Sequence, residues 1–205
     1  QFFGVGVGLA GVIYGQRGMV HYSPFFGWRD VPLAHMLQQR VGLPVVIEND
    51  VHSLTLTEHL FGAGRQCNNV VVVTVGRGIG MGMIINGQLY HGAQGGAGEL
   101  GHIIIDASRA HDNPIEGSLE RLAADPTVTE GYRSTAYRGG LQTVIELAKA
   151  GDEKAQARLT ASGEYLGVGL AAVVNILSPE MLIISGEGVM AGDYRLKPML
   201  DALKR

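Results

Sequence analysis

The alternation of short Val- and Ile-rich runs with longer helical patterns is the feature that most constrains how this chain folds. Short apolar runs bounded by turn residues are typical of buried strands, and apolar residues three and four positions apart are typical of one helix face. The runs predict strands at residues 2–8, 45–48, 70–75, 80–85 and 181–185, and helices at 32–41, 51–61, 141–150 and 152–177. Strands and helices mixed in this order indicate an α/β architecture.

Two segments between these elements carry strong turn signals. Asn86-Gly87 predicts a tight hairpin between the strand that ends at Ile85 and a short strand at Leu89. Residues 92–101 hold five glycines, and turn chemistry continues as far as Ile115. Because long loops are uncommon in compact domains unless they serve a function, we expect a functional loop here.

The composition narrows the classes of partner. A net charge of −3 provides no basic surface for nucleic acid or an anionic membrane, so we expect any DNA-binding part to lie outside this chain. No uncharged apolar stretch reaches the roughly 20 residues that span a bilayer, which predicts no membrane segment. The single cysteine, Cys67, excludes an internal disulfide and fits a reducing, cytoplasmic compartment. The chain opens on a strand-like run and stops within a helical pattern, so we expect a segment of a longer protein.

Glu48-Asn49-Asp50 lies where a predicted buried strand ends and a helix begins. Polar residues at the carboxyl end of a strand line the crevice in which α/β proteins bind ligands. A carboxylate beside an amide suits both holding a hydroxyl and removing its proton as a general base. The alternative is that Asn49 or Asp50 only caps the following helix.

Two further candidate sites contain glycine. The run Gly76-Arg77-Gly78-Ile79-Gly80-Met81-Gly82 leaves backbone N–H groups open to an anion such as phosphate, unless it is only a closely packed hairpin. Glu99 and His102 end the glycine-rich loop, and with Glu120 they offer the carboxylates and the imidazole that recognise the hydroxyls of a hexose. Taken singly, Glu120 is also explained as a favourable helix start and His102 as a satisfied strand residue.

The order of these features resembles the ROK family (repressors, open reading frames, kinases) over essentially the whole chain. The matching segments are Trp28-Arg29-Asp30-Val31-Pro32-Leu33, Leu43-Pro44-Val45-Val46-Ile47-Glu48-Asn49-Asp50, the Gly76 to Gly82 run, Asn86-Gly87-Gln88-Leu89-Tyr90, Gly96-Ala97-Gly98-Glu99-Leu100-Gly101-His102 and Ser185-Gly186-Glu187-Gly188-Val189. The resemblance implies the actin-like ATPase (ribonuclease-H-like) fold of two lobes with a sugar between them. Residues 1–50 would be the remainder of the first lobe, and residues 51–205 the second.

The resemblance also implies roles for single residues. The sugar, a hexose or N-acetylhexosamine, would be held by Asn49, Asp50, Glu99, His102 and Glu120, and in a kinase Asp50 would be the general base. In a kinase, ATP with magnesium would lie against Gly76, Arg77, Gly78, Gly80, Gly186 and Gly188. We also expect a homodimer or a higher homo-oligomer.

Two departures from the family pattern matter. Members with zinc use the His of the Gly-His pair and three cysteines, but the three cysteine positions here are His111, Asn113 and Ser118. Only His102 and His111 remain as ligands where a structural zinc needs four, so we expect no metal and no cofactor in this chain. The phosphate loop of kinase members usually reads Gly-Thr-Gly, whereas this chain has Arg77 in place of Thr.

Arg77 favours the effector domain of a sugar-responsive transcriptional regulator, which would reach DNA through an N-terminal domain outside this chain. The alternative is an ATP-dependent sugar kinase of the glucokinase or N-acetylhexosamine kinase type. The intact Asp50 leaves that alternative open.

Overall fold

A computed structural model describes residues 2–132 and 139–204. The chain divides into two compact units, Gln1–Val72 with Met81–Gly98 and Val73–Gly80 with Glu99–Arg205. The division passes through strands β6 (Val70–Val75) and β7 (Ile79–Ile85). The lobe boundary at residue 50 stays a prediction.

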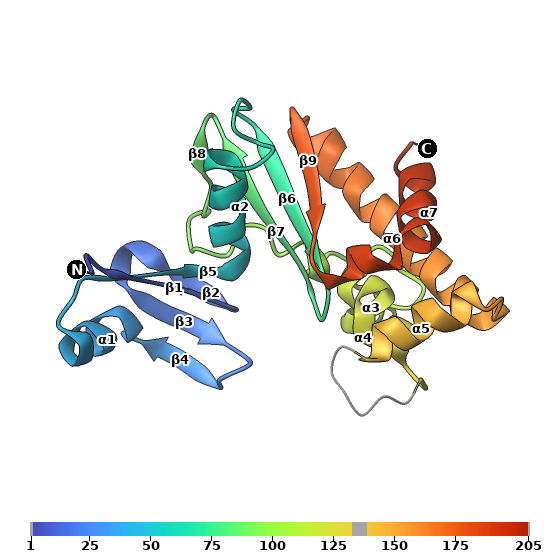
Figure 1. Cartoon of the computed structure of the whole chain (residues 1–205), viewed down its shortest axis with the longest axis horizontal. Coiled ribbons are helices and arrows are strands. Elements are labelled where there is room, and N and C mark those ends of the chain that lie inside the picture. The colour runs from blue at the N-terminus through green and yellow to red at the C-terminus, as the bar shows by residue number, and fades with distance from the viewer. Residues whose placement is uncertain (1, 133–138, 205) are drawn as a thin grey trace. The chain divides into compact units, whose positions relative to one another are not determined.

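The first unit contains two small sheets and two helices (Figure 1). Strands β1 (Val5–Leu9) and β5 (Val45–Asn49) pair in parallel, with Val5 opposite Val45 and Leu9 opposite Asn49. A three-stranded antiparallel sheet follows in the order β2-β3-β4. Its strands are β2 (Val12–Tyr14), β3 (Met19–Ser23) and β4 (Trp28–Val31).

Helix α1 (Leu33–Val41) closes the core of this unit. Its buried residues Leu33 and Ala34 belong to one apolar cluster with Ile13, Val20 and Ile47. The helix ends as predicted at Gly42, whose φ of 67° is the left-handed conformation that glycine adopts without steric cost.

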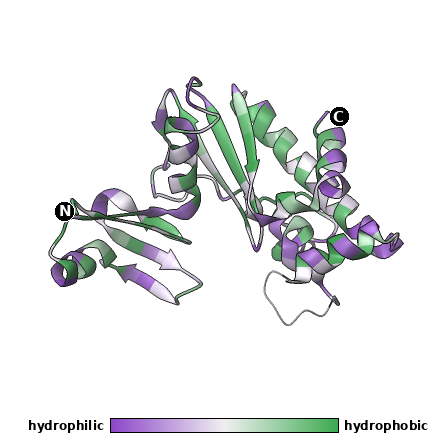
Figure 2. Ribbon diagram, viewed as in Figure 1, coloured by the Kyte–Doolittle hydropathy of each residue, from purple (hydrophilic) through white to green (hydrophobic). Residues whose placement is uncertain are grey.

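The third sheet has the strand order β8-β7-β6-β9, with β8 at Gln88–Leu89 and β9 at Met181–Ser185. Figure 2 shows apolar residues along β6, where five of the six residues are buried. Strands β7 and β8 form the predicted hairpin, because Ile85 pairs with Gln88 across two residues. Those two residues, Asn86 and Gly87, have φ values of 52° and 76°, as a primed hairpin turn requires.

Helices make up most of the second unit. They are α3 (Leu119–Ala123), α4 (Asp125–Thr129), α5 (Gly139–Lys149), α6 (Glu153–Leu177) and α7 (Asp193–Leu203), with short 3₁₀ turns η2 (Leu100–His102), η3 (Pro114–Gly117) and η4 (Glu187–Ala191). Helix α6 lies beside α7 because two of its glycines bring the backbones together. A side chain at Gly163 would overlap the Arg195 carbonyl, and one at Gly167 the Met199 carbonyl.

By length and composition alone, α6 is long and apolar enough to cross a membrane, although the sequence predicts no such span. Within its most apolar window, 44% of the residues are buried inside the protein. Leu159, Leu166 and Leu170 are among them, and these side chains of α6 belong to the core of this unit.

The elements predicted from the longest apolar runs are confirmed to within three residues at either end. Strands β2, β3 and β4 and helices α3 and α4 were not predicted as elements. The segment from Gly92 to Ile115 is a loop as expected, containing η2 and the start of η3.

Candidate functional site

Asn49 joins the end of β5 to the start of helix α2 (Asp50–Leu60). Its side-chain oxygen accepts hydrogen bonds from the backbone N–H groups of Val51 at 2.9 Å and His52 at 3.0 Å. Its Nδ2 donates to the Gly11 carbonyl at 3.0 Å. Asn49 is therefore the N-cap of α2, and the capping interpretation is confirmed for this residue.

Asp50 is the first residue of α2 and is exposed. One of its carboxylate oxygens accepts a hydrogen bond from the Val51 N–H at 3.0 Å. A carboxylate in the first turn is stabilised by the positive end of the helix dipole. The side chain is thus accessible, as a group that accepts hydrogen bonds from a ligand's hydroxyls must be.

Glu48 is the hub of a polar cluster that the sequence analysis missed. Its Oε1 accepts from the Asn49 N–H at 2.8 Å and lies 3.3 Å from His52 Nδ1, while its Oε2 lies 2.8 Å from His91 Nε2. Burial would raise the pKa of Glu48, but the hydrogen bonds with His52 and His91 outweigh burial and lower the pKa to about 2. Glu48 is therefore a carboxylate at neutral pH.

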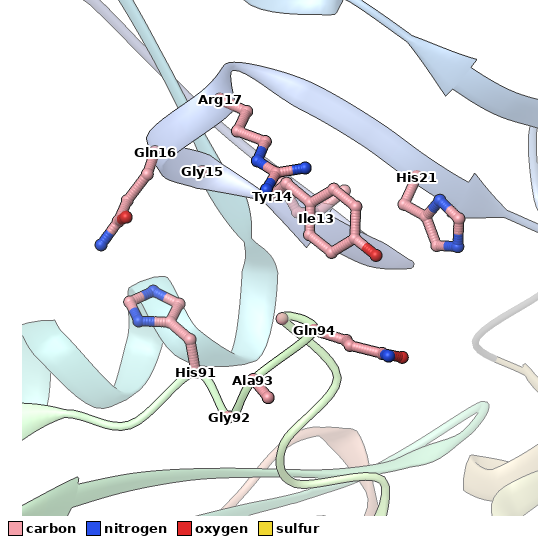
Figure 3. A pocket seen from close by; sticks show the side chains of 11 residues that line it. Ile13, Tyr14, Gly15, Gln16, Arg17, His21, His91, Gly92, Ala93 and Gln94 are labelled. Carbon is pink, nitrogen blue, oxygen red and sulfur yellow. The ribbon is translucent and has the colours of Figure 1, made fainter.

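A cavity of about 530 Å³ lies within the first unit, and His91 is part of its wall (Figure 3). The Tyr14 ring stacks on His21 with centroids 4.9 Å apart, and the Arg17 guanidinium lies 5.6 Å from the same Tyr14 ring. Gln16 and Gln94 add polar side chains to the wall. Polar and aromatic groups around one cavity are typical of a small-molecule site, and no sequence motif marked it.

In the second unit, Glu120 lies against the glycine-rich turn between β6 and β7. Its Oε2 accepts a hydrogen bond from the Ile79 N–H at 2.9 Å. A Cβ atom at Gly78 would lie 2.7 Å from this oxygen, and one at Gly101 would lie 2.6 Å from the Ile79 carbonyl oxygen, so the backbone packing requires glycine at Gly101. Glu120 is also in the first turn of α3, and the helix-start interpretation therefore holds alongside a ligand role.

Glu99 and His102 lie at either end of η2 and contact each other, with His102 Nε2 3.4 Å from Glu99 Oε2. Their side chains are 52% and 71% exposed, respectively. His102 is therefore in a 3₁₀ turn and largely open to solvent, and the interpretation of His102 as a satisfied strand residue is wrong.

The glycines predicted to contact a nucleotide come together at the end of β6. Gly76 donates to the Gly78 carbonyl at 3.0 Å and accepts from the Asp125 N–H at 2.8 Å. Gly186 has a φ of 94°, and a side chain there would overlap the backbone of Val75. The Arg195 Nη1 donates to the Gly188 carbonyl at 3.0 Å and to Asp125 Oδ1 at 2.8 Å, which ties both glycine segments to one buried ion pair.

The residues at the family's zinc positions do not fit a zinc ion. The His111 side chain is 84% exposed and pairs with Asp112. Asn113 caps η3, and the Ser118 hydroxyl donates to the Ile115 carbonyl at 2.7 Å. A tetrahedral site here lacks its ligands, and the absence of zinc from the protein stays a prediction.

Comparison with known proteins shows which family the chain belongs to. The profile of the ROK family matches residues 1–205. The chain belongs to the ROK family. A glucokinase of Halalkalibacterium halodurans is 35% identical over 97% of the chain and 66% of its own length. A putative xylose repressor of Caldicellulosiruptor is 32% identical over 96% of the chain and 53% of its own length.

Solved structures agree with the sequence matches. A ROK glucokinase of Streptomyces griseus, in complex with glucose and AMPPNP, aligns with a TM-score of 0.84 and 29% identity over 100% of this chain and 72% of its own. A ROK transcriptional regulator, a homologue of the E. coli MLC protein, aligns with a TM-score of 0.86 and 26% identity over 98% of this chain and 54% of its own. The fold is the actin-like ATPase fold of this family, as the sequence predicts. The chain spans between half and two thirds of the length of the first two curated relatives.

The site residues divide between the two units. Asn49 and Asp50 lie in the first unit, at the junction of β5 and α2. Glu99, His102, Glu120 and the glycines 76, 78, 80, 186 and 188 lie in the second. The ROK matches include both kinases and repressors, so family membership alone leaves the role open.

Proposed function

We propose that the chain is the sugar-binding effector domain of a ROK-family transcriptional regulator. The ligand is a hexose or N-acetylhexosamine, and the residues that hold it are Asn49, Asp50, Glu99, His102 and Glu120. The regulator forms a homo-oligomer and reaches DNA through a domain outside this chain. Sugar binding shifts the population of conformations that present that DNA-binding domain.

The exposed Arg77, at the turn between β6 and β7, is the observation that carries the choice of regulator over kinase. Sugar recognition needs only the hydroxyl-binding side chains, all of which are present. Phosphoryl transfer also needs a loop that holds the γ-phosphoryl in line with the acceptor hydroxyl, because positioning supplies most of the acceleration. A long guanidinium in place of a short hydroxyl alters the centre of that loop.

One specific observation favours a sugar kinase as the second candidate. Asp50 is exposed at a helix N-terminus, where it could act as a general base on a sugar hydroxyl. In that case Gly76, Gly78, Gly80, Gly186 and Gly188 would approach ATP, and magnesium would neutralise its phosphates.

The two candidates are separated by measuring ATP consumption and calorimetric sugar binding on the full-length protein with one panel of sugars: glucose, xylose and N-acetylglucosamine. We expect binding of at least one sugar and no significant turnover. Asp50→Asn weakens that binding by about 1–3 kcal/mol, the scale of a lost hydrogen bond to a charged group. A turnover of about 1 per second or faster that Asp50→Asn abolishes would establish the kinase instead.

A DNA-binding assay tests the regulator directly. The full-length protein is expected to bind a site near its own gene with an affinity that changes when the bound sugar is added. By reciprocity, the DNA changes the sugar affinity by the same factor. A sugar that binds tightly without changing the DNA affinity would contradict the proposed role.

A further inference from the structure

We infer that Glu48, His52 and His91 form a binding site for a divalent transition-metal ion, with zinc as the natural occupant. The inference is independent of the choice between regulator and kinase. It concerns residues other than the family's zinc position at His102, and it departs from the expectation that this chain holds no metal.

The ligand atoms already lie close together. Among the residues that the structure describes, these three are the set of His, Cys, Asp and Glu side chains whose ligand atoms all lie within 4.8 Å of one another. Zinc–nitrogen and zinc–oxygen bonds of about 2.1 Å at tetrahedral angles place neighbouring ligand atoms about 3.4 Å apart. Glu48 Oε1 lies 3.3 Å from His52 Nδ1, and Glu48 Oε2 lies 2.8 Å from His91 Nε2. The two histidine ligand atoms lie within 4.8 Å of each other, and rotation of the half-buried His91 side chain would adjust that spacing.

The position of the His52 ring relative to the Ala97 carbonyl also suits a metal ligand. Its Nε2 lies 3.1 Å from the Ala97 carbonyl, which can only accept, so Nε2 carries a proton. A neutral imidazole has one ring proton, which leaves a lone pair on Nδ1 facing the Glu48 carboxylate at 3.3 Å. In that tautomer the lone pair of this buried ring points toward the carboxylate, and a metal ion bound there would be shared by both groups.

The arrangement matches how proteins hold metals. A ligating histidine usually donates its second ring N–H to a carbonyl or carboxylate, which fixes the tautomer and aims the lone pair at the ion. His52 has this arrangement through Ala97. Two neutral histidines and one carboxylate are also a known zinc ligand set, with the fourth position left to water.

His91 provides the route of entry. Its side chain is 32% exposed and forms part of the wall of the 530 Å³ cavity, so an ion and its fourth ligand can arrive from there. To bind, His91 places its proton on Nδ1 and offers the Nε2 lone pair, replacing its hydrogen bond to Glu48. The ion would join the end of β5, the first turn of α2 and the segment after β8, next to the proposed sugar contacts Asn49 and Asp50.

Metal binding is tested on chelator-treated protein by calorimetric titration with ZnCl₂ and by visible absorption with Co²⁺. We expect one equivalent of Zn²⁺ and the intense absorption of four- or five-coordinate Co²⁺. His91→Gln should weaken Zn²⁺ binding by at least about 100-fold, since loss of even an outer-shell partner costs about 10–100-fold. His35→Gln, on the exposed face of α1, and His102→Gln, at the family's zinc position, should each change the affinity by less than about twofold.

A second measurement uses only the wild-type protein, so it does not depend on whether a variant folds. Nitrogen-15 NMR of the wild-type histidines should show His52 protonated only at Nε2, with the Nδ1 signal shifted by Zn²⁺. The inference is overturned if no equivalent binds, or if His102→Gln rather than His91→Gln abolishes binding. It is also overturned if His52 stays doubly protonated in excess Zn²⁺, because the cation between the two groups is then a proton.

Discussion

Arg195 shows at the scale of one residue how a buried charge holds two site loops. It is 1% exposed, and its Nη1 contacts both the Asp125 carboxylate and the Gly188 carbonyl. Burial raises the pKa of Asp125, and Arg195 opposes that rise, so the carboxylate depends on this one guanidinium to stay charged. Gly76 and Gly188 are both joined to this ion pair through the backbone, and the proposed nucleotide-facing loops therefore share one anchor.

Arg195→Met should lower the free energy of unfolding by about 3–5 kcal/mol, because it leaves Asp125 buried without a partner. Urea unfolding measures the loss, and Lys197→Met, at an exposed position of the same helix, should cost less than about 0.5 kcal/mol. The loss should shrink as the pH falls through the raised folded pKa of Asp125 toward the unfolded pKa of an aspartate. The folded pKa of Asp125 is raised further in the variant, so protonation then stabilises the folded state relative to the unfolded state. Equal losses for the two variants at neutral pH would contradict the anchoring role.

At the scale of elements, the sequence predicts the strands and helices whose pattern of apolar residues lies within the element itself. Val70–Val75 and Met181–Ser185 are continuous apolar runs, the first buried on both faces and the second half-buried, and both predicted strands match the structure at each end. Strands β2 to β4 are only three to five residues long and are interrupted by glycine and charged residues. Their core residues Ile13 and Val20 become buried only through packing against β5 and α1, which no local pattern reveals.

The residues of the candidate site also divide into those that a local sequence pattern predicts and those that come together only through the fold. The capping role of Asn49 was visible, because a polar residue between a strand and a helix is a local signal. The contact between Glu48 and His91 joins residues 43 positions apart, and it depends on where the segment after β8 passes. The Glu48 and His52 pair, four positions apart across the start of α2, was the one local sign of that cluster.

The turn before η2 supports a prediction about a single backbone position. Gly98 has a φ of 97°, its carbonyl accepts from the Met81 N–H at 3.0 Å, and a side chain would overlap the Met81 carbonyl. Gly98→Ala should therefore cost at least about 2 kcal/mol of stability, from backbone strain together with the clash. Gly96→Ala is the matched control, since its Cβ would meet nothing closer than Val12 at 4.0 Å. Chemical denaturation of both variants checks the prediction, which fails if they unfold at the same midpoint.

At the scale of the whole molecule, ligand binding and stability are linked by mass action. A ligand that binds only the folded state at a concentration of 100 times its Kd adds about 2.7 kcal/mol to the free energy of unfolding. For a chain of this length that raises the melting temperature by roughly 5–10 °C. The effect needs no activity, so it reports on sugar binding and on nucleotide binding separately.

The regulator proposal predicts that the cognate sugar raises the melting temperature by this amount and that ATP with Mg²⁺ leaves it unchanged. The reason is that the hydroxyl-binding residues are retained, whereas Arg77 stands in the centre of the phosphate loop. Scanning calorimetry in the presence of each sugar of the panel measures the shift, with glycerol at the same concentration as the control for unspecific polyol effects. Asp50→Asn should reduce the shift at a fixed sugar concentration, since weaker binding lowers the ratio of sugar concentration to Kd. A shift with ATP and Mg²⁺ as large as the one with sugar would mean that the nucleotide loops are intact, and the kinase would then be the better account of this chain.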